Sequence, residues 1–256
     1  MVGVEACYGF GDGLFLAPLI KRIAERHGGP VEMAVQAQCA DAFHNLPWVA
    51  KITHVNNLHD GMALFRDRPH SYQITPNVYF PSFKESHPDH SLIDTARGIG
   101  RHYGLGDFDQ RPIFLPSRED LEVRVNLLRP VIAVESHYKS GQSWADKNSF
   151  KPILDKYGST HDVLWLSNQD APNHPNVHTL KNCSRRQVIT LLSKAETFFS
   201  VGSGFFCASL ALEVPPQRIV CLWLDHFYCY ERRLAELGWH QNIKWVHNMD
   251  ELRANL

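Results

Sequence analysis

The sequence predicts an α/β protein made of two successive units, each built on a parallel, doubly wound sheet. Short β-rich runs alternate with amphipathic runs, and this alternation restarts near the middle of the chain. The length of 256 residues also suits two small domains, because domains commonly contain roughly 100 to 200 residues. We expect the boundary near Arg129, which gives units 1–129 and 130–256.

The composition is that of an ordinary globular protein, with 44% hydrophobic and 21% charged residues. The net charge of −1 gives no overall attraction to nucleic acid or anionic membranes, although it leaves a local basic patch and a polyanionic partner open. The 6 cysteines form no CxxC pair, so we expect reduced thiols. No run approaches the roughly 20 apolar residues of a membrane span, and the start lacks the build of a signal peptide. These features predict a cytoplasmic protein without a transmembrane segment.

The first unit has the order of a parallel sheet with crossover helices. Strands are expected at 2–7, 31–37, 50–55 and 72–75, and helices at 14–27, 39–46 and 91–103. In the first helix the apolar residues of 16–24 share one face, and Gly28 provides a stop signal. Pro18 is tolerated only near a first turn, so we expect this helix to begin just after Asp12. Residues 56–90 give a weak signal, which in a compact domain usually marks a functional or misassigned segment.

The second unit repeats this order after a proline-bounded connector at 111–130. Strands are expected at 131–136, 161–168, 197–202, 218–223 and 242–246, with helices at 149–157, 184–196, 203–212 and 226–237 and at the C-terminus. Ser149 is the expected cap of its helix, and Ser184 and Gln187 have the spacing of a capping box. Gly238 provides a stop signal for the helix before it.

The first strand leads into the glycine-rich run "YGFGDGLFLAPLI". This run fails as a dinucleotide fingerprint, because Leu14 holds the place of the third glycine and no acidic residue ends the second strand. A phosphate loop of the Walker type also fails, since no Gly-Lys-Ser/Thr follows. Asp12 remains, flanked by Gly11 and Gly13 at the strand edge where open α/β sheets bind ligands. Asp12 is either a helix cap or a functional carboxylate.

Three stretches resemble the heptosyltransferase-like glycosyltransferases of family 9. The N-terminal stretch has the Gly-Asp pair, the apolar pair "LF", Pro18 and the turn "NLPWV" in the order of that family. "RPVIAVESHYKSGQSWADKNSF" resembles its strand, phosphate-binding loop and tryptophan, and "FFSVGSGFFCASLALEVPPQRIVCLW" resembles its "DTGxxHLAAALGxPVVALFG" segment. The resemblance covers most of the chain in the same order and is remote.

The resemblance implies a GT-B fold, in which two Rossmann-like lobes face each other across a cleft. Residues 1–129 would then bind the acceptor and residues 130–256 the nucleotide-sugar. It also implies an inverting glycosyltransferase that passes a hexosyl, heptosyl or pentosyl group to a hydroxyl of a saccharide, a glycolipid or a modified nucleobase. Asp12 corresponds to the proposed general base, and carboxylates serve in that role when partly desolvated.

The diphosphate of the donor is the leaving group of the transfer. Backbone N–H groups at a helix start, hydroxyls and a lysine would stabilise its negative charge. Together with this chemistry, the resemblance implies that the donor, an ADP- or UDP-linked sugar, contacts Gly11, Gly13, His137, Lys139, Ser143, Ser167, Gly202, Ser203 and Gly204. Lys147 is an alternative to Lys139, since the register of that loop is open by a residue or two. Without the resemblance, Lys139 is interpreted as a solvated loop side chain, and Ser203-Gly204 as an ordinary turn before a helix.

Two departures from the family pattern concern the donor site. The aspartate of the family's Asp-Thr-Gly is Gly202 here, and its histidine is Phe206 or Cys207. The departures motivate an alternative function, a catalytically inactive nucleotide-binding module of the same fold. A sugar epimerase or oxidoreductase is a further alternative, which the failed dinucleotide fingerprint disfavours.

We expect no metal and no bound cofactor. His87 and His90 in "SHPDH" lack a convincing third ligand and are better explained as surface residues. The aromatic run "FYCY" at 227–230 has near-helical spacing, which is typical of a core or an interface. In GT-B inverting enzymes, lobe dipoles and lysines generally neutralise the phosphate charge without a metal.

Overall fold

The computed structural model describes residues 2–6, 9–74, 93–136, 143–146, 148–167, 171–223, 230–239 and 241–256. The chain divides into two compact units, Met1–Leu115 with Tyr228–Arg233 and Pro116–Phe227 with Leu234–Leu256. The segment around the expected boundary at Arg129 lies in the second unit. Each unit contains one parallel sheet with helices, which confirms the predicted α/β class.

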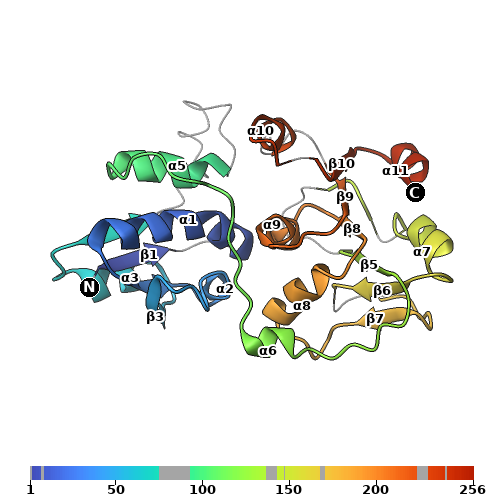
Figure 1. Cartoon of the computed structure of the whole chain (residues 1–256), viewed down its shortest axis with the longest axis horizontal. Helices are drawn as coiled ribbons and strands as arrows, with labels where there is room; N and C mark the ends of the chain where they lie inside the picture. Colours follow the sequence, from blue (N-terminus) through green and yellow to red (C-terminus); the bar gives the residue numbers. More distant parts are fainter. Residues whose placement is uncertain are drawn as a thin grey trace. The chain divides into compact units, whose positions relative to one another are not determined.

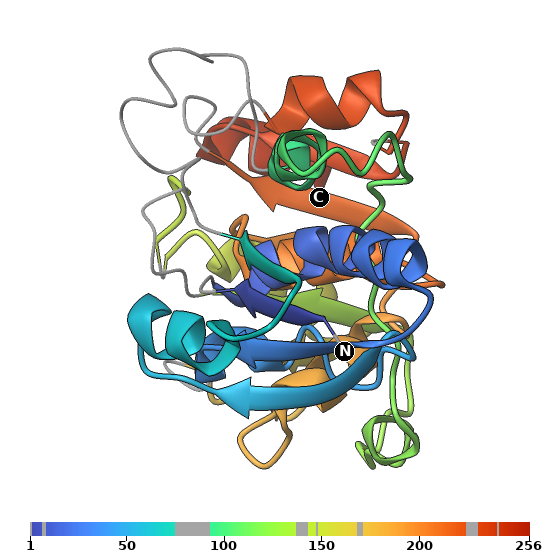
Figure 2. The ribbon, with the colours of Figure 1, turned by 90° about the vertical axis from the view of Figure 1, so that its left-hand side faces the viewer.

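The first unit holds a four-stranded sheet in the order β3-β2-β1-β4, and every neighbouring pair is parallel. Its strands are β1 (Gly3–Ala6), β2 (Val31–Val35), β3 (Val49–His54) and β4 (Ser71–Ile74). Its helices are α1 (Phe10–His27), α2 (Ala37–Ala40), α3 (Leu58–Phe65) and α5 (Ile93–His102). Figure 2 shows the arrows of β1, β2 and β3 side by side and pointing the same way.

The second unit holds a six-stranded sheet in the order β10-β9-β8-β5-β6-β7, again with every neighbouring pair parallel. Its strands are β5 (Val131–Val134), β6 (Asp162–Trp165), β7 (Val177–Thr179), β8 (Thr197–Ser200), β9 (Arg218–Leu222) and β10 (Ile243–Val246). Its helices include α6 (Arg118–Leu121), α7 (Lys151–Tyr157), α8 (Arg185–Leu192), α9 (Gly204–Ala211) and α11 (Met249–Asn255), and α10 (Tyr230–Glu236) is shared between the units. In Figure 1, α8 and α9 cover one face of this sheet and α7 and α11 cover the other.

Burial on both faces explains why the central strands of the second sheet are apolar throughout. All four residues of β5, β6 and β8 are buried, and Phe198 and Phe199 point to opposite faces of the sheet with no exposed surface. Phe199 packs in the core that also contains Phe150 and Trp165. A strand that is covered on both sides needs a continuous apolar run, so the sequence signal was strong here.

The start of α1 differs from the sequence-based prediction. The helix begins at Phe10, so Asp12 lies inside its first turn and Pro18 lies in its interior. A proline there removes one backbone hydrogen bond, which costs stability in an exposed helix. Here residues 13–20 are all buried, and the burial of this apolar surface offsets that cost.

Two other local expectations can be compared with the structure. The capping box of α8 is confirmed, because Ser184 Oγ accepts the Gln187 N–H at 3.2 Å and Gln187 Oε1 accepts the Ser184 N–H at 2.9 Å. The Ser149 cap is wrong: α7 is preceded by Phe150, while Ser149 closes a turn with Asp146. The sequence analysis also missed α3 and β7, which are short and only partly buried.

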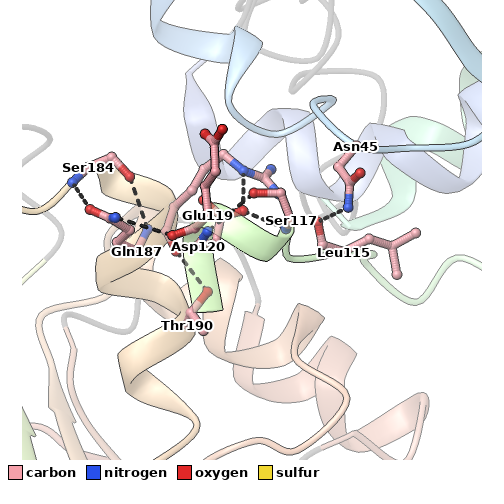
Figure 3. Close-up of polar contacts among 9 residues, drawn as sticks. Asn45, Leu115, Ser117, Glu119, Asp120, Ser184, Gln187 and Thr190 are labelled. Carbon is pink, nitrogen blue, oxygen red and sulfur yellow. Dashed lines mark hydrogen bonds and ion pairs between the residues drawn. The ribbon is translucent and has the colours of Figure 1, made fainter. Parts of the chain in front are cut away.

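The segment that follows Leu115 is fixed to the second unit by α6. Ser117 caps this helix, and Asp120 Oδ2 accepts both the Ser117 N–H at 2.7 Å and the Arg186 Nε–H at 2.9 Å (Figure 3). The side chains of Asp120 and Arg186 are only 7% and 9% exposed. In the first unit, Asn45 Nδ2 donates to the Leu115 carbonyl at 3.3 Å.

No described helix is both long enough and apolar enough to cross a bilayer. Within the described part of the chain, Cys39, Cys183, Cys207 and Cys221 carry thiol groups and form no disulfide. The cytoplasmic location stays a prediction.

Replacing Asp120 by alanine should destabilise the second unit strongly, because it removes the buried carboxylate that accepts the Arg186 Nε–H and the Ser117 N–H. We expect a loss of about 3 to 5 kcal/mol in the free energy of unfolding, measured with urea. Glu122→Ala is the matched control, since the Arg118–Glu122 pair is 92% and 61% exposed and should contribute less than about 1 kcal/mol. Equal losses in both variants would contradict the anchoring role of Asp120.

Candidate functional site

The order of the strands locates a ligand-binding edge in each sheet. Numbered from the start of each unit, the first sheet reads 3-2-1-4 and the second reads 3-2-1-4-5-6. Ligands of open α/β sheets bind at the carboxyl ends of the two strands where the winding reverses. These strands are β1 and β4 in the first unit and β5 and β8 in the second. Functional side chains are therefore expected directly after these strands.

Three predicted donor residues lie together in the turn between β8 and α9. Gly202 has a φ of +75°, and Ser203 is the N-cap of α9. The hydroxyl of Ser203 accepts the Phe205 N–H at 3.3 Å, and α9 begins at Gly204. A helix start of this kind presents backbone N–H groups and a partial positive charge, which suit an anion.

Gly202 has a structural reason to be glycine. A Cβ at this position would lie 2.0 Å from Trp223 Cζ3 and 2.1 Å from Cε3, far inside van der Waals contact. Trp223 is buried after β9, and its ring packs edge-on against Trp245 at a centroid distance of 5.9 Å. The left-handed backbone adds a second penalty for a side chain. The aspartate of the family signature therefore cannot be accommodated here while Trp223 is present.

The buried carboxylate of Glu135, which was not predicted from the sequence, accepts hydrogen bonds from this turn. Glu135 directly follows β5 and is 2% exposed. Its Oε2 accepts the Ser200 hydroxyl at 2.7 Å and the Val201 N–H at 3.2 Å, and its Oε1 accepts the Ser203 hydroxyl. The Ser200 hydroxyl oxygen in turn accepts the Gly202 N–H at 3.1 Å. Glu135 thus links the end of β5 to the whole β8–α9 turn.

Burial raises the pKa of Glu135 to about 7, although the hydrogen bonds from the turn oppose this shift. A group with such a pKa can change its charge near neutral pH. The signal available in the sequence was a single carboxylate at the end of the apolar strand "VIAVES". That pattern alone does not show what the carboxylate contacts.

The remaining donor candidates are placed differently. Ser143 is buried, donates its hydroxyl to the Leu222 carbonyl and accepts the Ala145 N–H at 3.1 Å. To donate to a phosphate, this hydroxyl would have to leave Leu222. Ser167 is half-buried just beyond β6, at the same carboxyl edge. The predictions for His137, Lys139 and the alternative Lys147 lie outside the described residues, as do those for His87 and His90.

In the first unit, Asp12 lies in the first turn of α1, directly after the carboxyl end of β1. Its side chain is half-buried, and its Oδ2 accepts the Gly9 N–H at 3.0 Å. Capping is therefore one observed task of this carboxylate, and its role as a base stays a prediction. Gly11 is buried, and a Cβ on Gly13 would lie 2.8 Å from Cys39 Sγ, so close packing of α1 on α2 explains the second glycine.

A second buried carboxylate lies in β1 itself. Glu5 is 1% exposed, and burial raises its pKa to about 7. It packs against α3, where a Cβ on Gly61 would come within 2.7 Å of Glu5 Cγ. The first strand of each unit therefore carries a buried acid near or just past its carboxyl end.

No protein-family model and no curated protein matches this sequence. Solved structures do match. The glycosyl transferase family 9 structure from Veillonella parvula DSM 2008 matches 99% of this chain and 87% of its own, with a TM-score of 0.70 and 10% identity. The E. coli ADP-heptose LPS heptosyltransferase II matches 99% of this chain and 97% of its own, with a TM-score of 0.63 and 12% identity. E. coli heptosyltransferase WaaC, solved with ADP-2-deoxy-2-fluoro heptose, matches 99% and 96%, with a TM-score of 0.61 and 12% identity.

The fold is therefore that of the GT-B glycosyltransferases. Within that class the structure is similar to family 9 and to the heptosyltransferases, which confirms the predicted resemblance as a remote one. The roles of the two units as acceptor and donor domains, and the cleft between them, stay predictions.

Gly202→Ala should destabilise the second unit because the new methyl group overlaps the ring of Trp223. Gly238→Ala is the matched control, since Gly238 has a similar φ of +70° and nothing lies within 4 Å of the place that a Cβ would take there. We expect about 1 kcal/mol for the control, from backbone strain, and about 1 to 3 kcal/mol more for Gly202→Ala, from overpacking. Urea unfolding measures both, and similar losses would argue against the clash.

Glu135→Gln should remove the contribution of Glu135 to the pH dependence of stability between about pH 4.5 and 7, while the contribution of Glu5 remains. In that window the folded wild type keeps the Glu135 proton while the unfolded chain releases it, so its unfolding free energy falls as pH rises. The fall amounts to roughly 3 kcal/mol and ends above the folded pKa. Urea unfolding at pH 5 and pH 8 measures it, with the half-exposed Glu196→Gln as control. An unchanged fall in Glu135→Gln would show that other groups cause it.

Proposed function

We propose that this protein is an inverting glycosyltransferase that moves a sugar from a nucleotide-diphosphate sugar to a hydroxyl group. The acceptor is a saccharide, a glycolipid or a modified nucleobase. The second unit binds the donor, the first unit binds the acceptor, and Asp12 acts as the general base. The reaction needs neither a metal nor a cofactor.

One observation carries this proposal: the helix start Gly202-Ser203-Gly204 stands at the point where the winding of the six-stranded sheet reverses. This is the expected position for a diphosphate in such a sheet, because the first N–H groups of α9 and its N-cap Ser203 lie at the carboxyl edge. Asp12 occupies the equivalent edge of the first sheet. The likeness to glycosyltransferases supports the same assignment.

The proposed mechanism divides the chemistry between the two units. Asp12 takes the proton of the acceptor hydroxyl as that oxygen attacks the anomeric carbon from the side opposite the leaving group, which inverts the configuration. The bond to the diphosphate breaks in the same step. The start of α9 stabilises the negative charge that develops on the departing diphosphate.

A catalytically inactive nucleotide-binding module is the alternative. Gly202 favours it, since the structure explains why no acidic side chain fits there and a contact of the family signature is missing. Incubation with ADP-, UDP- and GDP-sugars and a set of hydroxyl acceptors separates the two functions. ADP-sugars come first, because one similar enzyme is an ADP-heptose heptosyltransferase and another was solved with an ADP-linked heptose. Transfer or slow donor hydrolysis supports the enzyme, whereas nucleotide binding without either supports the module.

Asp12→Asn should lower transfer by about two to four orders of magnitude with little change in donor affinity, since it removes the base. The asparagine side-chain oxygen can still accept the Gly9 N–H, so the cap of α1 is retained. Asp12→Ala, which removes the cap as well, should also lower the free energy of unfolding by about 1 kcal/mol. Steady-state kinetics and urea unfolding measure the two effects. Near-wild-type turnover in Asp12→Asn would leave capping as the task of Asp12.

A further inference from the structure

The N-terminal end of α9 already holds an internal anion when Glu135 is ionised. Both oxygens of this buried carboxylate accept hydrogen bonds from the β8–α9 turn, from the Ser200 and Ser203 hydroxyls and from the Val201 N–H. The backbone of Ser203 also hydrogen-bonds to it. These are the kinds of donors that a phosphate would use at a helix start. A diphosphate bound here would therefore meet donors that are already engaged and a like charge behind them.

The direction of the Ser203 hydroxyl shows how an ionised Glu135 competes with a bound phosphate for a hydrogen-bond donor. An ionised carboxylate only accepts hydrogen bonds, so the single proton of the Ser203 hydroxyl points to Glu135. The hydroxyl oxygen meanwhile accepts the Phe205 N–H. In this state Ser203 has no proton to give to a phosphate oxygen. If Glu135 is protonated, its own O–H can donate to a serine oxygen, and the Ser203 proton becomes available for the ligand.

We propose that a nucleotide-sugar binds at the start of α9 together with one proton, which is taken up by Glu135. Glu135 is then a positioning residue: it sets the direction of the Ser203 hydroxyl and the charge behind the diphosphate. The proton comes from solvent on binding and returns to solvent when the diphosphate product leaves. This inference rests on the proposed function, because it needs a diphosphate at this site.

The surroundings of Glu135 support this coupling. Its raised pKa of about 7 has burial as its main cause, and the opposing contributions come from hydrogen bonds of Ser200, Val201 and Ser203. In the described residues, none of these contributions comes from a charged side chain. An added anion would raise the pKa further. His137 and Lys139 follow Glu135 in the sequence outside the described residues, so the experiment includes a variant of the histidine.

The test measures the affinity of ADP-glucose, UDP-glucose and GDP-mannose between pH 6 and 9 by calorimetry. The diphosphate of these probes does not titrate in that range, and the adenine of ADP-glucose does not either, so a change in the affinity of ADP-glucose reports on the protein. In the wild type, we expect the affinity to fall by up to about tenfold per pH unit above pH 7, with about one proton taken up per ligand. In Glu135→Gln, which is neutral at every pH, we expect a flat profile without that proton.

Two control variants make the result specific to Glu135. Glu196→Gln changes a half-exposed carboxylate at the opposite end of β8 and should keep the wild-type slope. His137→Gln tests a predicted donor contact that can itself titrate: the affinity of this variant can fall at every pH, but the wild-type slope should remain. Calorimetry of the wild type in buffers of different ionisation enthalpy gives the number of protons taken up per ligand. This measurement does not depend on the folding of any variant.

The outcomes separate the two proposals. Binding with equal slopes in wild type and Glu135→Gln, or a slope that disappears in His137→Gln, overturns the coupling and leaves the proposed function standing. A wild type that binds without proton uptake overturns the coupling in the same way. Failure of all three probes to bind either protein at pH 6 overturns the proposed function, and the coupling with it.

Discussion

The hydrogen bonds between Glu135 and the β8–α9 turn determine how the second unit presents its candidate site. They connect the end of β5 to the turn that follows β8 and to Ser203, the N-cap residue of α9. A buried carboxylate is tolerable there only because the turn supplies several donors for it. The same contacts fix the direction of the Ser203 hydroxyl. The geometry of the helix start and the protonation of one side chain therefore depend on each other.

The site keeps an acidic group although the signature aspartate is absent. In the family 9 pattern the acid precedes the Thr-Gly turn, whereas in this chain position 202 is a glycine in contact with Trp223. Glu135 supplies a carboxylate to the same turn from the neighbouring strand, but from the buried side. Its charge is consequently shielded from water and adjustable by protonation near neutral pH.

Much of the fold could be predicted from local patterns. The buried strands of the second sheet are continuous apolar runs, and the Ser184–Gln187 capping box has a fixed spacing, so both were recognised. The start of α1 was misplaced because Pro18 was expected to lie only in a first helical turn, whereas the burial of α1 offsets the cost of a proline in the helix interior. Short elements such as β7 lack enough residues to show a period. The candidate site was only partly predictable. Gly202, Ser203 and Gly204 were proposed because the resemblance to family 9 assigned donor binding to this small-residue turn, and that role stays a prediction. Glu135 was missed, since its partners lie at least 65 positions away and only the pairing of β5 with β8 brings them together.

The contact between Gly202 and Trp223 also constrains how this site can change over successive substitutions. An aspartate introduced first at position 202 meets the indole ring, so that variant should be selected against whatever it adds to ligand binding. Once a smaller side chain replaces Trp223, the left-handed backbone is the remaining obstacle, and aspartate tolerates it better than most residues. The two positions are therefore epistatic, and a library meant to restore the acidic signature should vary both codons at once.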